Sequence, residues 1–430
     1  MTSAETVAPR SQAFCQRRVV VVGQGFVGLP ASMLAVQAGH NVVGYDTNVR
    51  RVTRLESGDS YISDVSSDHL REALTSGRFT PTNDPAMLED FDVALIAVPT
   101  PLVGDQPDLS YIEAAAACLA GYIRSGCLVI LESTTCPGTT ENVVAPILET
   151  SGLKAGQDFS LGYAPERLNP GISFVELVKV PKVVSGVDAS STMAVTEFWS
   201  ELVASVVAAR NVRTAEVEKL VENAFRLVNI SFVNELARLA RSLDVSIWDV
   251  LDLAATKPYG YMSFLPSAGA GGHCLPSDTT YLAWSLRTAA QPSTLIDTAI
   301  DINRSQPVYV AGRVVAGMLR RNHTTTHHHT PHVVIVGATY KPDIADSRDS
   351  AALKVAHNLR QQGVDVAVVD PMLVDTADVL PELTVELVTR ATAVVLLVAH
   401  EGLDYDLISS ARYVFDACGA LPPANNIERL

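Results

Sequence analysis

The sequence predicts an α/β fold in which two doubly wound domains are joined by a central domain built on a long helix. Short runs of β-branched residues alternate with helical stretches from residue 18 to about residue 210, and the alternation returns after residue 332. Between these regions, residues 215–243 contain neither proline nor glycine, which is typical of one long helix. We therefore expect α/β domains over residues 18–210 and 332–430, with the helical domain over residues 211–322.

The remaining two segments are predicted to be irregular. Residues 1–17 are polar and have no apolar stretch typical of a secretory signal, so we expect a flexible arm. Residues 323–331 include the run His327-His328-His329 but neither apolar periodicity nor cysteine partners. We interpret them as a linker rather than a metal site.

The composition excludes several classes of protein. At 430 residues, 47% hydrophobic and 18% charged, the chain can bury a large core and is too long for one average domain. Its net charge of −15 argues against nucleic acid and acidic membranes as partners, because both attract basic surfaces. Its six cysteines form no Cys-x-x-Cys pair, and no apolar run is long enough to span a membrane. We expect a cytoplasmic protein with reduced thiols and no bound metal.

The first α/β domain opens with a glycine-rich turn between a strand and a helix. The sequence predicts a strand over Arg18–Val22, a helix over Leu29–Ala38 and a second strand over Asn41–Tyr45 that leads into Asp46. The first turn reads Gly23-Gln24-Gly25-Phe26-Val27-Gly28. This order of strand, turn, helix, strand and acid is typical of a dinucleotide-binding Rossmann domain.

Each key residue of this motif has a physical role. Gly23 permits the tight turn, Gly25 lets a pyrophosphate approach the backbone, and Gly28 lets helix and strand pack closely. The helix N-terminus offers N–H groups and a partial positive charge to the pyrophosphate. Asp46 would accept the ribose hydroxyls and repel a 2′-phosphate, so the sequence predicts NAD rather than NADP.

Two later strands end in segments that are expected to face the cofactor. Val93–Val98 ends at Pro99-Thr100-Pro101, and Leu128–Leu131 is followed by Glu132-Ser133-Thr134. Ser133 and Thr134 would either cap the next helix or line the nicotinamide edge of the site.

Four further residues carry charges or amides that could meet a ligand. Glu166 and Arg167 adjoin in a proline-rich loop and form either a solvated pair or part of a site. Lys219 and Asn223 stand four positions apart on the predicted long helix, so both project from one face. They are either ordinary polar residues or a cation and an amide aimed together at a ligand oxygen.

The segment Gly269–Asp278 holds one cysteine, Cys274, behind a run of small residues. Glycines before a cysteine leave backbone N–H groups able to meet an oxyanion. If a helical turn starts at Cys274, Asp278 lies on the same side of the chain. The segment contains either a core cysteine at a tight turn or a nucleophilic thiol with a polar helper.

The second α/β domain lacks a Gly-x-Gly-x-x-Gly turn and is expected to bind something other than a whole dinucleotide. Lys341 and Arg348 fall where a helix N-terminus would meet phosphates. The helical stretch before this domain, residues 293–319, contains Pro307 and is interpreted as two helices or one kinked helix. The predicted strands of the domain are His332–Gly337, Val364–Asp370, Ala393–Val398 and Arg412–Asp416.

The motifs together resemble those of the UDP-glucose/GDP-mannose dehydrogenase family, over residues from about 18 to 420. The resemblance implies that a homodimer or higher homo-oligomer oxidises the C6 alcohol of a nucleotide sugar to a carboxylate in two NAD-dependent steps. Residues 165–171 resemble those of members acting on UDP-N-acetylhexosamines, and residues 249–264 resemble those of UDP-N-acetylglucosamine 6-dehydrogenases in particular. UDP-N-acetylmannosamine and UDP-glucose are the alternative substrates. The motifs are Gly23–Gly28, Pro99–Pro101, Glu132–Thr134, Pro165–Arg167, Lys219 with Asn223, Gly271–Asp278, Lys341-Pro342 and Asp346 with Arg348.

The resemblance also implies roles for particular residues. Cys274 would capture the aldehyde as a thiohemiacetal, which is oxidised to a thioester that Glu166 helps to hydrolyse. The catalytic set is Cys274, Lys219, Asn223, Asp278, Glu166 and Thr134. The cofactor-binding set is Gly23, Gly25, Phe26, Val27, Gly28, Asp46, Arg51, Pro99, Thr100, Thr134 and Arg348. The substrate-binding set is Glu166, Arg167, Lys219, Asn223, Tyr259, Gly271 and Lys341.

Two other classes of function fit part of the sequence. A single-step alcohol or hydroxyacid dehydrogenase could carry the same nucleotide domain and would form one NADH per substrate. A catalytically silent nucleotide-sugar-binding module is the other alternative. The set of Cys274, Lys219 and Asp278 argues against a silent module.

Overall fold

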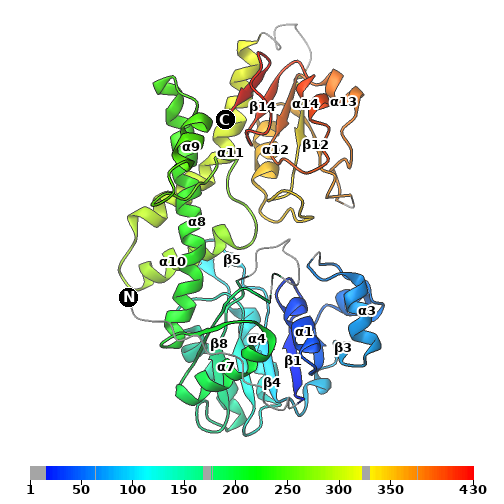
Figure 1. Cartoon of the computed structure of the whole chain (residues 1–430), viewed down its shortest axis with the longest axis vertical. Coiled ribbons are helices and arrows are strands. Elements are labelled where there is room, and N and C mark those ends of the chain that lie inside the picture. The colour runs from blue at the N-terminus through cyan, green and yellow to red at the C-terminus, as the bar shows by residue number, and fades with distance from the viewer. Residues whose placement is uncertain (1–15, 63, 168–175, 177, 322–329, 375) are drawn as a thin grey trace. The chain divides into compact units, whose positions relative to one another are not determined.

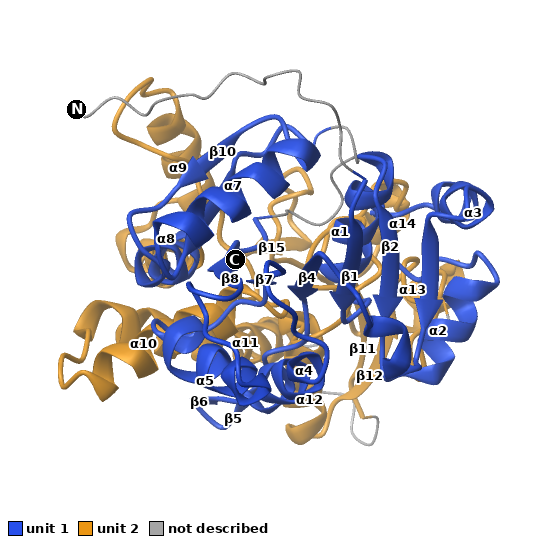
Figure 2. Ribbon diagram, turned by 90° about the horizontal axis from the view of Figure 1, so that it is seen from below, with its two compact units in different colours: residues 1–222 blue, residues 223–430 orange. Residues whose placement is uncertain are grey.

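The computed structural model describes residues 16–62, 64–167, 176, 178–321, 330–374 and 376–430. Contacts divide the chain into two compact units, Met1–Glu222 and Asn223–Leu430, which are taken in turn (Figure 2). Most of the predicted arm and linker lies outside the described residues, and the limits of the three predicted domains stay predictions.

In the described part of unit 1, eight strands form one sheet in the order β10-β9-β8-β7-β4-β1-β2-β3. Neighbouring strands are parallel except β8 and β9, which are antiparallel. The chain moves outward from β1 in one direction through β2 and β3 and in the other through β4, β7 and β8 (Figure 1). This is the order of a Rossmann sheet, whose ligand site lies beyond the carboxyl ends of the central strands. The strands are β1 Arg18–Val22, β2 Asn41–Tyr45, β3 Phe79–Thr82, β4 Val93–Ile96, β7 Leu128–Leu131, β8 Ser160–Tyr163, β9 Lys182–Gly186 and β10 Val206–Ala208, with a separate hairpin of β5 Leu102–Val103 and β6 Gln106–Pro107.

Helices cover both faces of this sheet because β1 is apolar on both sides. Val19 and Val21 join the core under α1 and α7, whereas Val20 and Val22 join the core under α4. Figure 2 shows α1 and α7 on one side of the strands and α4 and α5 on the other. This alternation is what a doubly wound sheet requires. The helices are α1 Gly28–Gln37, α2 Val49–Glu56, α3 Ser67–Thr75, α4 Ser110–Ala120, α5 Ala145–Leu148 and α7 Ala189–Leu202.

The described part of unit 2 contains a parallel sheet of five strands in the order β12-β11-β13-β14-β15. Val333 and Ile335 of β11 pack with α11 and α12, while Val334 and Val336 pack with α13 and α14. The strands are β11 His332–Val336, β12 Asp365–Val369, β13 Ala393–Leu396, β14 Val414–Asp416 and β15 Ile427–Arg429. The helices are α9 Ile247–Ala255, α10 Leu275–Thr288, α11 Thr294–Arg320, α12 Ala351–Gln361, α13 Val385–Arg390 and α14 Tyr405–Ser409, and the long α8 Val212–Ala240 runs from unit 1 into unit 2.

The structure confirms the predicted α/β class with parallel sheets and a long-helix region. One local prediction is partly wrong. The stretch with Pro307 is not two helices but the single helix α11, in which Pro307 is buried. A proline inside a helix costs about 3 kcal/mol, so burial of the residues around Pro307 must offset that cost.

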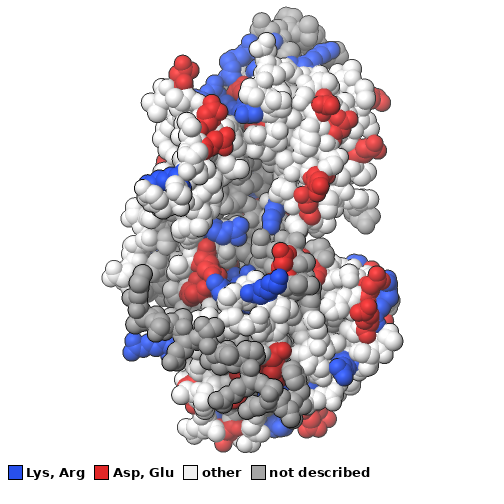
Figure 3. Space-filling view, viewed as in Figure 1, with Lys and Arg blue, Asp and Glu red and all other residues white. Residues whose placement is uncertain are grey.

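The surface and the helix lengths bear on possible partners. On the face shown in Figure 3, acidic and basic side chains of the described residues are interspersed, and no continuous basic surface extends across it. No helix in the described part of the chain has the length and apolar character needed to cross a membrane.

Candidate functional site

The turn after β1 is shaped by its glycines. Gly23 has φ +91°, and a Cβ there would lie 2.5 Å from the carbonyl oxygen of Ala97. A Cβ on Gly28 would lie 1.8 Å from the carbonyl oxygen of Gly23, so only glycine fits at either position. A Cβ on Gly25 would meet nothing within 4 Å. Open space at Gly25, directly before α1, is what the approach of a pyrophosphate requires.

Asp46 stands at the end of β2 beside this turn. Its carboxylate accepts hydrogen bonds from the backbone N–H groups of Gln24 and Asn48, each at 2.8 Å. The guanidinium of Arg51 is also 2.8 Å from Asp46 and lies over the ring of Tyr61. The structure thus places the predicted acid and Arg51 together with the glycine turn, and residues Phe26 and Val27 are half-buried in it.

The ends of β4 and β7 are tied together by Ser133. Its hydroxyl accepts a hydrogen bond from the Val98 N–H at 2.9 Å and donates to the Val98 carbonyl oxygen at 2.8 Å. Thr134 next to it is half-buried, while Pro99 is exposed and Thr100 is buried. Ser133 therefore holds the loop that carries these predicted cofactor residues instead of capping a helix.

A buried charge cluster that the sequence did not predict surrounds Glu166. The ammonium of Lys182 lies 2.5 Å from a carboxylate oxygen of Glu132 and 3.0 Å from one of Glu166. Burial raises the pKa of Glu132 to about 7, although the positive charge of Lys182 acts in the opposite direction. Burial also acts to raise the pKa of Glu166, but Lys182 and Lys219 outweigh it and lower that pKa. The sequence signal for the cluster was a lysine opening a buried strand, where charges are rare.

The other predicted residues of unit 1 lie near this cluster. Lys219 on α8 is buried and acts electrostatically on Glu166, so these two predicted residues come together. Arg167 instead forms a close ion pair with Glu222 and donates to the Pro181 carbonyl oxygen at 2.7 Å. Burial and the neighbouring Glu222 raise the pKa of Glu218 to about 7.

In unit 2, Cys274 is exposed immediately before the first residue of α10. The N–H of Asp278 donates to the carbonyl oxygen of Cys274 at 2.8 Å, so the cysteine starts the first helical turn. The side-chain amide of Asn223 donates to the buried carboxylate of Asp278 at 2.6 Å. A helix N-terminus favours an anion such as a thiolate.

The glycines before Cys274 are required by packing. A Cβ on Gly271 would lie 2.7 Å from the carbonyl oxygen of Asp349, and one on Gly272 would lie 2.8 Å from the ring of Tyr340. Gly272 also has φ +82°. The segment therefore packs tightly against the loop that follows β11, which also carries Lys341.

Three amide side chains that the sequence did not single out hold the start of this segment. Asn234 accepts from the Ser267 N–H at 2.8 Å, and Gln306 donates to the Ser267 carbonyl oxygen at 2.9 Å. Asn303 accepts from the Ala270 N–H at 2.7 Å and donates to the Ala270 carbonyl oxygen at 3.0 Å. Polar residues on the inner faces of α8 and α11 were the available signal, because buried amides need partners.

The remaining predicted residues of unit 2 are Arg348, Lys341 and Tyr259. Arg348 forms a bidentate pair with Asp346, in which Nε donates to Oδ1 at 3.0 Å and a terminal nitrogen donates to Oδ2 at 2.6 Å. Lys341 is half-buried and Tyr259 is 73% exposed. Burial and the positive charge of Arg348 lower the pKa of His273, which keeps this neighbour of Cys274 neutral.

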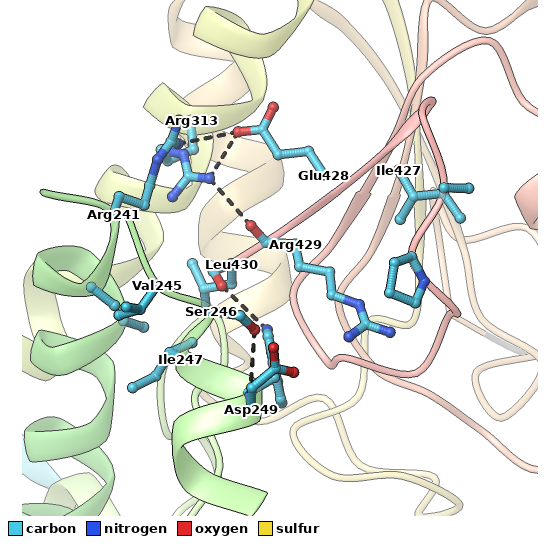
Figure 4. A pocket seen from close by; sticks show the side chains of 15 residues that line it. Arg241, Val245, Ser246, Ile247, Asp249, Arg313, Ile427, Glu428, Arg429 and Leu430 are labelled. Carbon is cyan, nitrogen blue, oxygen red and sulfur yellow. Dashed lines mark hydrogen bonds and ion pairs between the residues drawn. The ribbon is translucent and has the colours of Figure 1, made fainter. Parts of the chain in front are cut away.

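A cavity of about 470 Å³ in unit 2 contains none of the predicted residues. Figure 4 shows Arg241 and Arg313 reaching Glu428 at its edge, with distances of 3.3 and 2.8 Å. Burial is outweighed there by the arginines, which lower the pKa of Glu428 to about 2. Both arginines pair with Glu428, so the cluster joins α11 and the residue that follows α8 to β15.

The Rossmann sheet, its glycine turn and the exposed cysteine at a helix N-terminus define a nicotinamide-dependent dehydrogenase as the class of protein. More particularly, the chain belongs to the UDP-glucose/GDP-mannose dehydrogenase family. The NAD binding domain of that family matches residues 17–203, its central domain matches residues 213–305, and its UDP binding domain matches residues 334–423. The protein is therefore an NAD-dependent nucleotide sugar 6-dehydrogenase.

Similar proteins are named for different sugars. The chain is 35% identical over 384 residues to a UDP-N-acetyl-D-mannosamine dehydrogenase of Pyrococcus horikoshii, with 89% of each chain covered. It is 33% identical over 359 residues to a UDP-N-acetyl-D-glucosamine 6-dehydrogenase of Pseudomonas aeruginosa, with 82% of each covered. The solved structure of the Pyrococcus horikoshii UDP-D-ManNAc dehydrogenase has a TM-score of 0.88 at 32% identity, covering 96% of this chain and 98% of that one.

Proposed function

We propose that the protein oxidises the C6 hydroxyl of a UDP-N-acetylhexosamine to the carboxylate, with UDP-N-acetylglucosamine as the preferred substrate. The similarity of residues 249–264 to UDP-N-acetylglucosamine enzymes supports this sugar. UDP-N-acetylmannosamine is the second candidate, because a relative named for it matches at 35% identity. The two sugars differ in configuration at C2, so the contacts to the N-acetyl group decide between them.

The observation that carries the proposal is the setting of Cys274. Its thiol is exposed at the N-terminus of α10, behind two glycines for which a side chain has no room. In the proposed reaction the Cys274 thiolate attacks the C6 aldehyde, so the sugar stays bound as a thiohemiacetal. NAD, when bound, accepts the hydride of each oxidation.

The proposed roles of the neighbouring polar groups follow from their chemistry. A water associated with Asp278 takes the proton of the C6 hydroxyl, and Thr134 assists it. Lys219 and Asn223 donate to the oxyanion, and each such donor is typically worth roughly 3 kcal/mol of barrier. Glu166 acts as base when water hydrolyses the thioester. Gly23, Gly25, Gly28 and Asp46 would hold the cofactor, and Lys341 would hold the UDP group.

The Cys274→Ser variant tests the covalent step. A serine hydroxyl is a much weaker nucleophile than a thiolate, so we expect complete oxidation to fall by at least about a thousand-fold. Cys118→Ser, which changes a partly buried cysteine in α4, is the matched control and should keep its activity. Undiminished formation of two NADH per sugar by Cys274→Ser would rule out the thioester.

A substrate panel tests the choice of sugar. UDP-N-acetylglucosamine, UDP-N-acetylmannosamine and UDP-glucose are compared at equal concentration by NADH absorbance. We expect the highest kcat/KM with UDP-N-acetylglucosamine. A higher value with UDP-N-acetylmannosamine would replace the first candidate with the second.

We also propose that the protein is a homo-oligomer assembled through α8. Phe225, Phe232 and Leu239 are each about half exposed and are spaced by seven residues, which puts them on one face of the helix. A second copy of the chain would bury this apolar face. Light scattering should show a dimer or larger assembly that Phe232→Glu weakens, and a monomeric parent protein would contradict the proposal.

A further inference from the structure

The cluster of Glu132, Lys182 and Glu166 lies at the edge of the sheet where a Rossmann fold binds its ligands. Glu132 directly follows the carboxyl end of β7, and Glu166 lies just beyond the carboxyl end of β8. Because β9 runs antiparallel to β8, its first residue, Lys182, comes to the same edge. This reversal of one strand is what brings the lysine beside both carboxylates.

The cluster fixes the orientation of the Glu166 carboxylate. One of its oxygens is 3.0 Å from Lys182, and the other accepts the Arg167 N–H at 2.7 Å. Lys182 is 5% exposed and its ammonium lies 4.0 Å from the centre of the Trp199 ring. Water therefore screens the pair poorly, and the contact is worth more than a surface ion pair.

The single ammonium of Lys182 contacts both carboxylates of the cluster. Two carboxylates share one ammonium in a buried place, and the groups facing Glu166 are Lys182, Glu132, Lys219 and Arg167. One oxygen of Glu132 is buried without a hydrogen-bond partner among the described residues. Because the pKa of Glu132 is raised to about 7 and that of Glu166 is lowered, Glu132 takes up a proton before Glu166 as the pH falls, and Glu166 stays ionised.

We propose that Lys182, assisted by Glu132, positions Glu166 and keeps it ionised as the base that hydrolyses the Cys274 thioester. The proposal rests on the proposed function, in which Glu166 has that role. Water adds to the thioester carbonyl carbon and gives a proton to Glu166, the C–S bond breaks, and its electron pair stays on the Cys274 sulfur. The products are the thiolate and the sugar carboxylic acid, which releases the second proton of the water to solvent and becomes the carboxylate. No electrons are exchanged with the cofactor in this step. Lys182 is a positioning residue, since it acts through Glu166.

The test separates the oxidations from the hydrolysis. In Lys182→Met we expect rapid formation of up to two NADH per active site to persist, followed by a steady-state rate at least about tenfold below that of the parent protein at pH 7. Mass spectrometry should find the sugar acyl group on Cys274. Without Lys182, burial raises the pKa of Glu166. The steady-state rate should then increase with pH over a higher pH range than in the parent protein, and at high pH it should partly recover. Lys182→Arg keeps the charge and should restore most of the steady-state rate.

Two further variants guard against a folding defect. The double variant Lys182→Met/Glu132→Gln removes the cation together with one carboxyl. It therefore does not leave two buried carboxylates together without Lys182, and it should show the same slow hydrolysis. Lys154→Met removes an exposed lysine that lies 2.7 Å from Glu149 and is the matched control. The positioning role is wrong if the single and the double variant both fold but lose the rapid phase as much as the steady-state rate. It is also wrong if neither phase is slowed in these variants. Either result would leave the proposed function standing. If the parent protein forms no NADH from any UDP-N-acetylhexosamine, the proposed function itself fails.

Discussion

The loops that follow the first strands of the two sheets begin alike and end differently. Gly23 after β1 and Gly337 after β11 have φ of +91° and +87°, and a Cβ on either would lie about 2.5 Å from a carbonyl oxygen of the neighbouring strand's end. Both loops donate backbone N–H groups to an acid at the end of the next strand. Gln24 donates to Asp46 at 2.8 Å, and Thr339 donates to Asp370 at 3.0 Å.

The two loops diverge after the glycine. In unit 1 the helix starts at once at Gly28, beside open space at Gly25. In unit 2 the helix starts only at Ala351, and the longer loop packs Tyr340 against Gly272 of the cysteine segment. Asp370 also differs from Asp46, because it is fully buried and lies 3.0 Å from the buried ring of His400.

The difference shows that one strand–glycine–acid frame can serve two purposes. Where further glycines follow and a helix begins at once, the frame offers N–H groups to a pyrophosphate. Where the loop is long, the same frame anchors a surface against which the cysteine segment rests. Substitutions at matched positions of the two loops should therefore have different consequences.

The largest effect is expected for Gly28→Ala. The new Cβ would lie 1.8 Å from the Gly23 carbonyl oxygen, and neither backbone segment can move without breaking the turn. We expect loss of NAD binding and a lower melting temperature, measured by calorimetry with and without NAD. Gly25→Ala is the control for folding, because its Cβ meets nothing within 4 Å. It should keep the melting temperature and raise the KM for NAD about tenfold, since a methyl group would stand where the pyrophosphate approaches. Normal NAD affinity in both variants would contradict the assignment of the turn.

A smaller loss is expected for Gly272→Ala in unit 2. An alanine at a left-handed φ costs about 1–2 kcal/mol, and the ring of Tyr340 must also move. The melting temperature should fall by several degrees, at about 2–4 °C per kcal/mol for a unit of this size. Adding Tyr340→Ala should remove the clash but leave the backbone strain, so part of the loss should persist. Full recovery in the double variant would show that the strain is negligible.

The two acids should differ in what their loss affects. Asp46→Asn should weaken discrimination against NADP, because the carboxylate that repels a 2′-phosphate is gone while Arg51 remains. We expect the ratio of kcat/KM for NAD to that for NADP to fall by about tenfold, measured at saturating sugar. Asp370→Asn should leave this ratio unchanged. A change of the ratio in Asp370→Asn would mean that the two loops are not functionally separate.

The smallest effect is expected in the pH dependence of stability. Burial acts to raise the pKa of Asp370, but His400 and the backbone N–H groups of Ala338 and Met372 outweigh it and lower that pKa. A carboxyl whose pKa is lowered in the folded state contributes fully to stability when the pH is above its pKa in the unfolded state, near 3.9. This contribution is lost as the pH falls through the pKa in the folded state. The free energy of unfolding of Asp370→Asn, from urea titrations, should therefore fall less steeply below about pH 4 than that of the parent protein. Equal slopes would contradict this role of Asp370.

Much of the fold could be predicted because its signals are local. The limits of β1, β2 and β7 follow from short apolar runs bounded by glycine or polar residues, and the structure has these strands at the predicted residues. The continuity of α11 through Pro307 could not be predicted, because it depends on packing around the buried proline. The edge strands β10 and β15 have only three residues each, which is too few to stand out in the sequence.

The parts of the site that escaped prediction are those made by distant residues. Glu132 follows β7 and Lys182 opens β9, and the antiparallel direction of β9 brings Lys182 to Glu132 and Glu166. The amides of Asn234, Asn303 and Gln306 lie on two helices, and the fold brings them together around the backbone of residues 267–270. Gln306 also donates directly to Asn234 at 3.3 Å. Cys274, by contrast, could be identified from one short motif. The predicted helical turn from Cys274 to Asp278 is present as the first turn of α10.

The most direct test of the account is the number of NADH formed per sugar when UDP-N-acetylglucosamine is limiting and NAD is in excess. Capture of the aldehyde on Cys274 between two oxidations predicts two NADH per sugar and no aldehyde that a carbonyl reagent can trap. One NADH per sugar, with an aldehyde or ketone as the product, would contradict the account and indicate a single-step dehydrogenase.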